Sequence, residues 1–441
     1  MSISPQLKRF DLTMIVVSLV IGVGIFQTPA QVAKHAGSEW VFYLAWITGG
    51  IISIIGALTF AEIGARLPAA GGYYRIFSYT YHPAFAFMLN WSQVIINAGS
   101  SSGVALIGAQ YITPVLFPNT TQDVLIERII SLTILFILFG INFAGIKMGA
   151  KTQNFLSVLK IVMIAIFCLA IFGEHAPEQP GTKPDDWNFV QAFGIALISI
   201  FFTFGGYQQT VNFGADVHEP KKNIPLAIFS GVGIVIVLYL LINIAYVQVL
   251  GFEHVQTSKL IARDLANALF GNTGGTIVSI VIFTSVLGFL NTSVMSNPRV
   301  YYAMAEDKAL PGIFRQINQK TQVQQFGLTF FVSVMIVSLF VLKDFEQIVN
   351  YVLFIDSFSL ASAAAALFIL RRKSAGDYAG YKMPGYPVLP IIYILVLLYV
   401  TYSTVVKDPV AARYGFLIFV MGLPLYYIIT NSVQRMSKND N

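Results

Sequence analysis

Charged residues are scarce in this chain of 441 residues: Asp, Glu, Lys and Arg make up 11% of it, whereas hydrophobic residues make up 56%. Ordinary soluble domains carry roughly 25% charged residues, and a soluble fold of this size could not bury so much apolar surface. The apolar residues also come in runs of about twenty, the length that crosses a hydrocarbon core about 30 Å thick. The composition therefore excludes a soluble protein and predicts an all-α membrane protein.

Residues that hold metals, disulfides and cofactors are rare as well. The single cysteine, Cys168, excludes an intramolecular disulfide. The five histidines show no metal-ligand spacing, so we expect no metal site and no cofactor. The chain contains no phosphate-binding Gly-x-x-x-x-Gly-Lys-Ser/Thr loop, which argues against an ATP-driven pump. No nucleophile and base share a depth in the predicted helices, so we do not expect an enzyme.

The apolar runs predict twelve transmembrane helices with no separate soluble domain between them. The first run starts near Leu12 and many others follow it, which indicates a true span rather than a removable signal peptide. The predicted spans are 12–34, 40–66, 82–115, 124–146, 152–173, 190–218, 223–250, 273–305, 326–343, 345–370, 387–406 and 411–433.

Lysine and arginine are distributed unevenly over the two sides of this arrangement. If the N-terminus is cytoplasmic, the cytoplasmic loops and tails carry 18 of these residues and the outer loops carry 8. Cytoplasmic loops are enriched in Lys and Arg, so the bias predicts a multi-pass protein of the inner or plasma membrane with both termini in the cytoplasm. Topology thus explains the net charge of +6, and no nucleic-acid partner is expected.

Glycine pairs interrupt two of the predicted spans. The first span contains Gly22-Val23-Gly24-Ile25-Phe26, and the sixth contains Phe202-Thr203-Phe204-Gly205-Gly206-Tyr207. Each glycine weakens a helix by roughly 1 kcal/mol relative to alanine. Inside a bilayer, an unwound turn is tolerated only where protein buries it or where it lines a cavity. Taken singly, each pair could instead serve close helix packing.

The spacing of the two interruptions favours an internal repeat. Gly24 and Gly206 lie 182 residues apart, and the span starts at 12 and 190 lie 178 residues apart. Two halves of five helices, 12–173 and 190–371, are then followed by two further helices, 387–433, and flanked by tails 1–11 and 434–441. An odd number of helices per half inverts the second half. Inverted repeats with broken leading helices, here 1 and 6, indicate a secondary transporter with a midplane substrate site.

The two breaks suggest what could bind there, because free N–H groups suit a carboxylate and free C=O groups suit an ammonium. The residues expected to offer amides are Gly24, Ile25 and Phe26, with Gly22 and Val23 beside them. The residues expected to offer carbonyls are Phe202, Thr203 and Phe204, with Gly205 following. A zwitterionic α-amino acid would fit both ends.

Five motifs in this order resemble those of the amino acid–polyamine–organocation transporter superfamily, over essentially the whole chain. They are Gly22-Val23-Gly24-Ile25-Phe26; Phe60-Ala61-Glu62-Ile63-Gly64-Ala65-Arg66-Leu67-Pro68 with Gly71-Gly72-Tyr73-Tyr74; Gly205-Gly206 followed by Asp216, Glu219, Pro220, Asn223 and Pro225; Arg299-Val300-Tyr301-Tyr302-Ala303-Met304-Ala305-Glu306-Asp307; and Tyr381-Lys382-Met383-Pro384-Gly385-Tyr386-Pro387.

Within that superfamily the chain looks most like the L-type amino acid transporters and their bacterial relatives. The resemblance implies alternating access, by exchange or by proton symport. It implies that Phe202 is an aromatic gate over bound substrate and that Gln208 stands where the family usually has Asn. Val23 stands where the family usually has Ser or Thr, and Tyr207 where it usually has Trp.

Lys160 lies inside the fifth predicted span, where a lysine costs several kcal/mol unless it reaches an interface or a partner. One interpretation is that it snorkels to the cytoplasmic face. The resemblance implies instead that it fills the place of sodium in related sodium-coupled carriers. It would then bridge carbonyls of the broken first helix to the eighth span, at Ser285 or Asn291. This implies sodium independence, and the same lysine could couple a proton.

Acidic residues are absent from both breaks, so a cationic substrate would lack an obvious counter-ion there. We therefore expect neutral L-amino acids, with a cationic amino acid or polyamine carrier as the alternative. Asp356, in the tenth span, could line a vestibule, carry a proton or cap polar groups.

A partner subunit is not expected. The resemblance implies that animal L-type members join a single-pass partner through a cysteine between the third and fourth spans. The loop from Pro118 to Asp123 has no cysteine here. We therefore expect no disulfide-linked heavy subunit and a protein that works as a single chain, with the amino acid and the lipid bilayer as its partners.

Overall fold

The computed structural model describes residues 3–118, 122–173, 176, 188–341, 345–373 and 378–439. Within these ranges the regular structure is helical, apart from two isolated backbone bridges. The long helices are α3 (Glu39–Arg66), α5 (Pro83–Leu116), α6 (Asp123–Phe143), α7 (Ile146–Cys168), α9 (Pro220–Leu250), α12 (Gly274–Glu306), α13 (Gln325–Val341), α14 (Phe345–Lys373), α15 (Val388–Lys407) and α16 (Pro409–Asn439). The shorter ones are α1 (Arg9–Val20), α2 (Thr28–Ala36), α4 (Gly72–Thr80), α8 (Phe189–Thr203), α10 (Phe252–Thr257) and α11 (Ile261–Phe270).

The predicted all-α fold with membrane-crossing helices is confirmed. In the described ranges, eight helical segments are long and apolar enough to cross a membrane. A helix also overlaps each of the twelve ranges predicted as spans, but the count of twelve crossings and the inverted repeat stay predictions. The helices α4, α10 and α11 occupy predicted loops, and α16 extends to Asn439, beyond the predicted span end at 433. Parts of both predicted tails, and of the 118–123 loop, lie outside the described residues.

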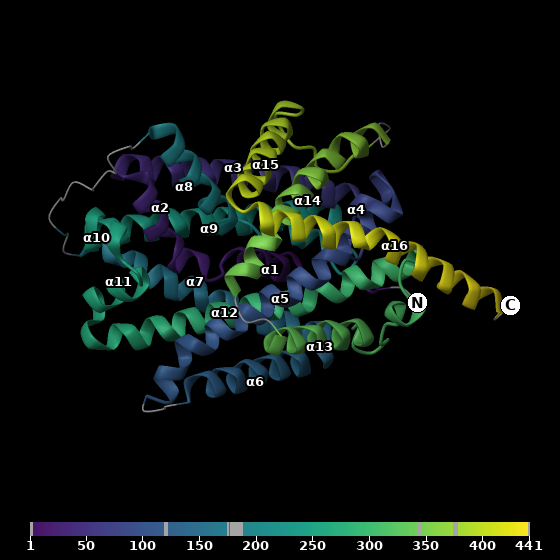
Figure 1. Cartoon of the computed structure of the whole chain (residues 1–441), viewed down its shortest axis with the longest axis horizontal. Helices are drawn as coiled ribbons and strands as arrows, with labels where there is room; N and C mark the ends of the chain where they lie inside the picture. The colour runs from purple at the N-terminus through teal and green to yellow at the C-terminus, as the bar shows by residue number, and fades with distance from the viewer. Residues whose placement is uncertain are drawn as a thin grey trace.

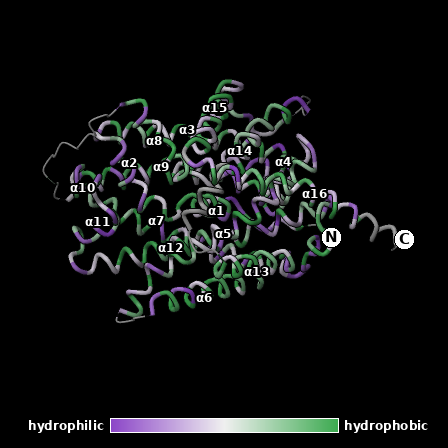
Figure 2. Tube along the Cα trace, in the orientation of Figure 1, coloured by the Kyte–Doolittle hydropathy of each residue, from purple (hydrophilic) through white to green (hydrophobic). Residues whose placement is uncertain are grey.

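Burial of each helix follows its place in the bundle. Every residue of α1 from Leu12 to Val20 is buried, whereas α6 lies along the lower edge of the bundle in Figure 1 and exposes apolar side chains such as Phe136 (58% exposed). Figure 2 shows hydrophobic residues along α6 and more hydrophilic ones near α10 and α11. Such apolar outer faces fit a hydrocarbon surrounding, which does not penalise them as water would.

Both chain ends lie at the same end of the bundle, on the right in Figure 1. The N-terminal segment is held there by a parallel bridge between Leu7 and Val217. We call this end, which also carries Arg75, Arg299 and Arg371, the basic end.

The structure shows both interruptions that the glycine pairs predict. The helix α1 ends at Val20, and a short 3-10 turn, η1 (Gly24–Phe26), precedes α2. The helix α8 ends at Thr203, and a second 3-10 segment, η3 (Tyr207–Asn212), continues the chain.

The two breaks lie against each other, and glycine makes the contact possible. Gly206 has a φ of +113°, and a Cβ at this residue would lie 2.2 Å from the carbonyl oxygen of Leu19. A Cβ at Gly24 would lie 3.3 Å from the Thr203 side chain. No residue with a side chain fits at position 206 without moving the backbone of α1.

Gly206→Ala should therefore destabilise the protein, because its methyl group would overlap the Leu19 carbonyl and the residue would keep a positive φ. Backbone strain of this kind costs about 1–3 kcal/mol, so we expect a lower melting temperature in detergent. Gly233→Ala is the matched control, since a Cβ on this exposed residue of α9 meets nothing within 4 Å. Equal melting temperatures for the two variants would contradict the contact between the breaks.

Candidate functional site

The first break leaves three consecutive amides without an acceptor in the described part of the chain, those of Val23, Gly24 and Ile25. The Phe26 amide donates to the Val23 carbonyl at 3.1 Å, and the Gly22 amide donates to the last carbonyl of α1. The prediction of a free Phe26 amide is therefore wrong, because the 3-10 turn uses it. Gly22, Val23 and Gly24 are partly exposed, whereas Ile25 and Phe26 are buried.

Lys160 of α7 lies next to this break. Its ammonium donates to the Ile21 carbonyl at 2.8 Å and to the Ser285 carbonyl of α12 at 3.2 Å. The side chain is fully buried, so it does not snorkel to a surface. Among the described residues, no carboxylate lies within ion-pair distance of it. The structure thus brings Lys160 and Ser285 together at the end of α1, through the carbonyl of Ser285 rather than its hydroxyl.

Asn291, the other residue expected beside Lys160, lies elsewhere. It is six residues beyond Ser285 on α12, a rise of about 9 Å, and its side chain donates to Gln153 at 2.9 Å. It belongs to a buried polar chain that joins α6, α12, α7 and α1 through Asn142, Asn291, Gln153, Ser157 and Ser18. Sequence reasoning missed this chain, although Gln153 and Ser157 share a helix face four residues apart.

The second break presents an aromatic ring and a hydroxyl group. Phe202 is half-buried, and its ring meets that of Phe201 edge-on with centroids 5.6 Å apart. The Thr203 hydroxyl donates to the Thr28 hydroxyl at 2.9 Å. Because Thr28 is the first residue of α2, this bond joins the end of α8 to the start of α2.

The backbone after Phe202 is only partly available to a ligand. The Gly205 amide donates to the Phe202 carbonyl at 3.2 Å, and the Phe204 amide is shared between that carbonyl and the Ile200 carbonyl. The Phe204 ring is buried against Trp46 and Tyr239, with centroids 5.9 and 5.1 Å away. Phe204 can therefore serve a ligand through its main chain alone.

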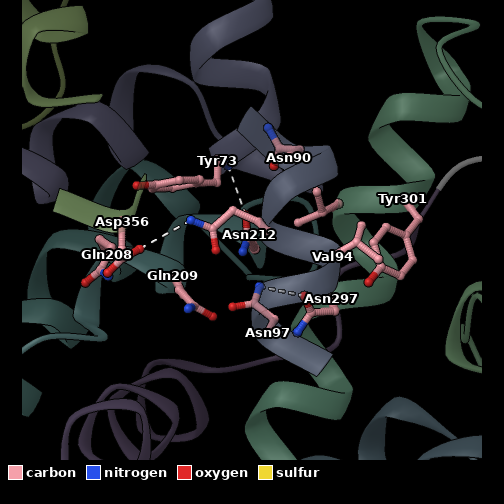
Figure 3. A pocket seen from close by; sticks show the side chains of 12 residues that line it. Tyr73, Asn90, Val94, Asn97, Gln208, Gln209, Asn212, Asn297, Tyr301 and Asp356 are labelled. Atoms are coloured by element: carbon pink, nitrogen blue, oxygen red, sulfur yellow. Dashed lines mark hydrogen bonds between the residues drawn. The ribbon is translucent and has the colours of Figure 1, made fainter. Parts of the chain in front are cut away.

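A polar cavity adjoins the second break (Figure 3). Gln208 lines it, and the Oε1 atom of Gln208 accepts a hydrogen bond from the Gly206 amide at 2.9 Å. The space open to the centres of water molecules is about 20 Å³, enough for roughly one water and too small for an amino acid. The other lining residues are Tyr73, Asn90, Gln93, Val94, Asn97, Gln209, Asn212, Asn297, Val300, Tyr301 and Asp356.

Sequence reasoning missed this cavity as well. Asn90, Gln93 and Asn97 lie on one face of α5 at i, i+3 and i+7, and that spacing inside an apolar span is a signal that could have found them. Asn97 donates to Asn297 of α12 at 2.9 Å, and Gln93 donates to Asp356 of α14 at 3.3 Å. The cavity thus lies where α5, α12, α14 and η3 meet.

Ion pairs hold the basic end together next to the cavity. Arg299 of α12 donates to Asp216 at 2.6 Å, and both side chains are buried. Arg75 of α4 pairs with Glu306 and Asp307. Burial opposes the charge of Arg75, but the two carboxylates outweigh it and raise the pKa of Arg75. In the described ranges, no group of three or more His, Cys, Asp or Glu side chains is arranged to hold a metal ion.

Comparisons with known proteins agree with this architecture. A family model described as amino acid permease matches residues 7–430. The serine/threonine exchanger SteT of Bacillus subtilis is 29% identical over 95% of both chains. The human cystine/glutamate transporter is 26% identical over 94% of this chain and 83% of its own length. The human large neutral amino acids transporter small subunit 2 is 25% identical over 94% of this chain and 78% of its own length.

The match to the family model covers nearly the whole chain, and the resemblance carried by the five motifs is confirmed. The relatives named above are transporters and exchangers rather than enzymes. The chain therefore belongs to the amino acid permease family of the amino acid–polyamine–organocation superfamily, and it is a multi-pass membrane transporter of amino acids.

Proposed function

We propose that the protein is a sodium-independent carrier of neutral L-amino acids that works by alternating access, as an exchanger or a proton-coupled symporter. The observation that carries this proposal is the row of unpaired amides at Val23, Gly24 and Ile25. Unpaired amides are costly in a membrane protein, and they bind an anionic group well. The α-carboxylate of an amino acid is such a group.

The opposite break supplies the other pole of the site. The carbonyls of Phe202, Thr203 and Phe204 accept the α-ammonium, and Gly205 lets the chain turn away there. Phe202 then closes over the bound molecule as an aromatic gate. Its half-buried ring supports this role, because a fully packed ring could not move without disturbing its neighbours.

Neutral side chains are the best fit to the breaks, because no acidic residue lies at either of them. Two of the relatives are named for serine and threonine and for large neutral amino acids. A cationic amino acid or polyamine carrier is the second candidate. The presence of Asp356 in the cavity beside Gln208 favours it, since a carboxylate there could serve as a counter-ion.

Lys160 underlies the proposed sodium independence. Its ammonium joins the Ile21 carbonyl to the Ser285 carbonyl, and a fixed cation at this place leaves no need for a bound metal ion. The same proposal includes twelve crossings in an inverted 5+5 repeat plus two helices, cytoplasmic termini, and a protein that acts as a single chain without a disulfide-linked subunit.

Counterflow in liposomes tests the proposed transport. Purified protein is reconstituted in vesicles loaded with each of the twenty unlabelled amino acids in turn, and uptake of the labelled form is measured in sodium-free buffer. We expect internal neutral amino acids to accelerate uptake, because the loaded site returns faster than the empty one. Acceleration by lysine, arginine or a polyamine alone would favour the second candidate, and no acceleration by any of the twenty would refute amino acid exchange.

Lys160→Met should reduce the initial rate of uptake about 10- to 100-fold. The variant keeps the length of the side chain but leaves the Ile21 and Ser285 carbonyls without their donor, and a hydrogen bond to a charged group contributes about 1.5–3 kcal/mol. Lys151→Met, at an exposed position of the same helix, is the control and should transport normally. Normal uptake by Lys160→Met, or rescue of it by sodium, would argue against the fixed-cation role.

A further inference from the structure

Asp356 is a carboxylate without a cationic partner in the part of the chain that the structure describes. It lies within α14 and accepts a single hydrogen bond, from the Gln93 amide at 3.3 Å. The buried carboxylates differ: Asp216 pairs with Arg299 at 2.6 Å, and Glu62 pairs with Arg371 at 2.6 Å, whereas Asp356 is only partly buried. A carrier of neutral amino acids, the first candidate function, gives Asp356 no role.

The described groups that face Asp356 carry no fixed charge. The helix α14 packs against α3, α4, α5, α15 and α16. Titratable neighbours of Asp356 are the tyrosines Tyr73 of α4 and Tyr393 of α15, and Tyr207 of η3 hydrogen bonds to Tyr393 at 2.9 Å. On the remaining elements, Gln93 of α5 donates to Asp356, Phe419 of α16 packs against Phe358 two residues further along α14, and the Glu62 carboxylate of α3 is paired with Arg371 near the end of α14.

An isolated carboxylate among such neighbours is unfavourable within a membrane. A proton or a bound cation would remove this charge. The cavity beside Asp356 has about 20 Å³ for water centres, which admits a water molecule but not an alkylammonium side chain. The space favours a proton delivered by water.

We propose that Asp356 is a proton-binding group of the transport cycle. A hydrated proton in the cavity transfers to the carboxylate, which gives a neutral carboxylic acid and a water molecule; the reverse step returns the proton to water. Gln93 suits both forms, because its amide nitrogen donates to the carboxylate and its amide oxygen can accept from the acid after a flip.

Gln208 connects the protonation state of Asp356 to the proposed substrate site. This residue lines the same cavity as Asp356, and its side chain accepts a hydrogen bond from the Gly206 amide, at the second break, at 2.9 Å. One unit of charge in the cavity therefore changes the electrostatic balance next to the turn that holds the proposed ammonium contact. This inference rests on the proposed function and selects proton symport as its coupling mode.

Accumulation driven by a pH gradient tests the inference. Vesicles containing the full chain receive an inward gradient of one pH unit and the labelled neutral amino acid that gives the strongest counterflow. One coupled proton can drive accumulation of about tenfold at most. We expect wild type to approach this limit and Asp356→Asn to show none, while Asp356→Asn still catalyses counterflow. Asp123→Asn, which removes an exposed carboxylate, should accumulate like wild type.

A second measurement needs no loss of function. In infrared difference spectra recorded between acidic and neutral pH, wild type should show the carbonyl stretch of a titrating carboxylic acid that Asp356→Glu shifts. This measurement decides the assignment even if Asp356→Asn does not fold. Absence of the band from the wild-type spectrum, or an unshifted band in Asp356→Glu, overturns the assignment.

The outcomes separate this inference from the proposed function. Undiminished accumulation by Asp356→Asn overturns the proton site. A wild type that shows counterflow but no accumulation under the pH gradient also overturns it, although amino acid exchange would then stand. Loss of only lysine and arginine transport in Asp356→Asn, with the gradient response intact, would make Asp356 a counter-ion for a cationic substrate and also overturn it. Absence of all counterflow would refute the proposed function itself.

Discussion

Hydrocarbon offers no hydrogen bonds, so each backbone N–H and C=O group of a broken membrane helix needs a partner within the protein or from a ligand. The first break meets this constraint unevenly. Its carbonyl side is satisfied by fixed side chains, since the Lys160 ammonium binds the Ile21 carbonyl and the Tyr239 hydroxyl binds the Val20 carbonyl at 3.2 Å. Its amide side keeps unpaired donors at Val23 to Ile25. A break with free donors and occupied acceptors selects a ligand that is anionic at one end.

A lysine among carbonyls also limits how such a carrier can be driven. A covalently attached ammonium stays with the protein, so on the proposed function Lys160 supplies a positive charge at the break without a bound metal ion. The driving force then comes from another solute on the opposite side or from protons, bound at Lys160 or elsewhere. Among the described residues, Asp356 is a carboxylate within a predicted span that no fixed cation pairs with, and on the further proposal it complements Lys160.

The sequence predicted those features that a local pattern can encode. Gly206 was identifiable because a helix that opens next to another backbone requires glycine. Lys160 was identifiable because a charge inside an apolar run is costly unless it reaches an interface or a partner. The position of Asn291 was not predictable, because Ser285 and Asn291 both fall on the eighth predicted span and only packing decides which one meets Lys160. The prediction of a free Phe26 amide was wrong for a different reason. A break need not be fully unwound, and the 3-10 turn at Gly24–Phe26 uses the amide that an open loop would leave free.

The polar cavity was hidden from sequence because its members come from helices far apart along the chain, yet one short segment ties it to the rest of the site. Within residues 206 to 216 the chain makes the second break at Gly206, lines the cavity with Gln208, and forms the buried ion pair of the basic end through Asp216. The 3-10 segment η3 carries Gln208 and connects Gly206 to the turn that holds Asp216. On the proposed function, an opening of the basic end that separates Asp216 from Arg299 would act on a segment directly continuous with the turn that contacts Leu19. On the proposed function, this continuity gives alternating access a physical route, because the segment that pairs with Arg299 at the basic end continues the segment that forms the proposed substrate site.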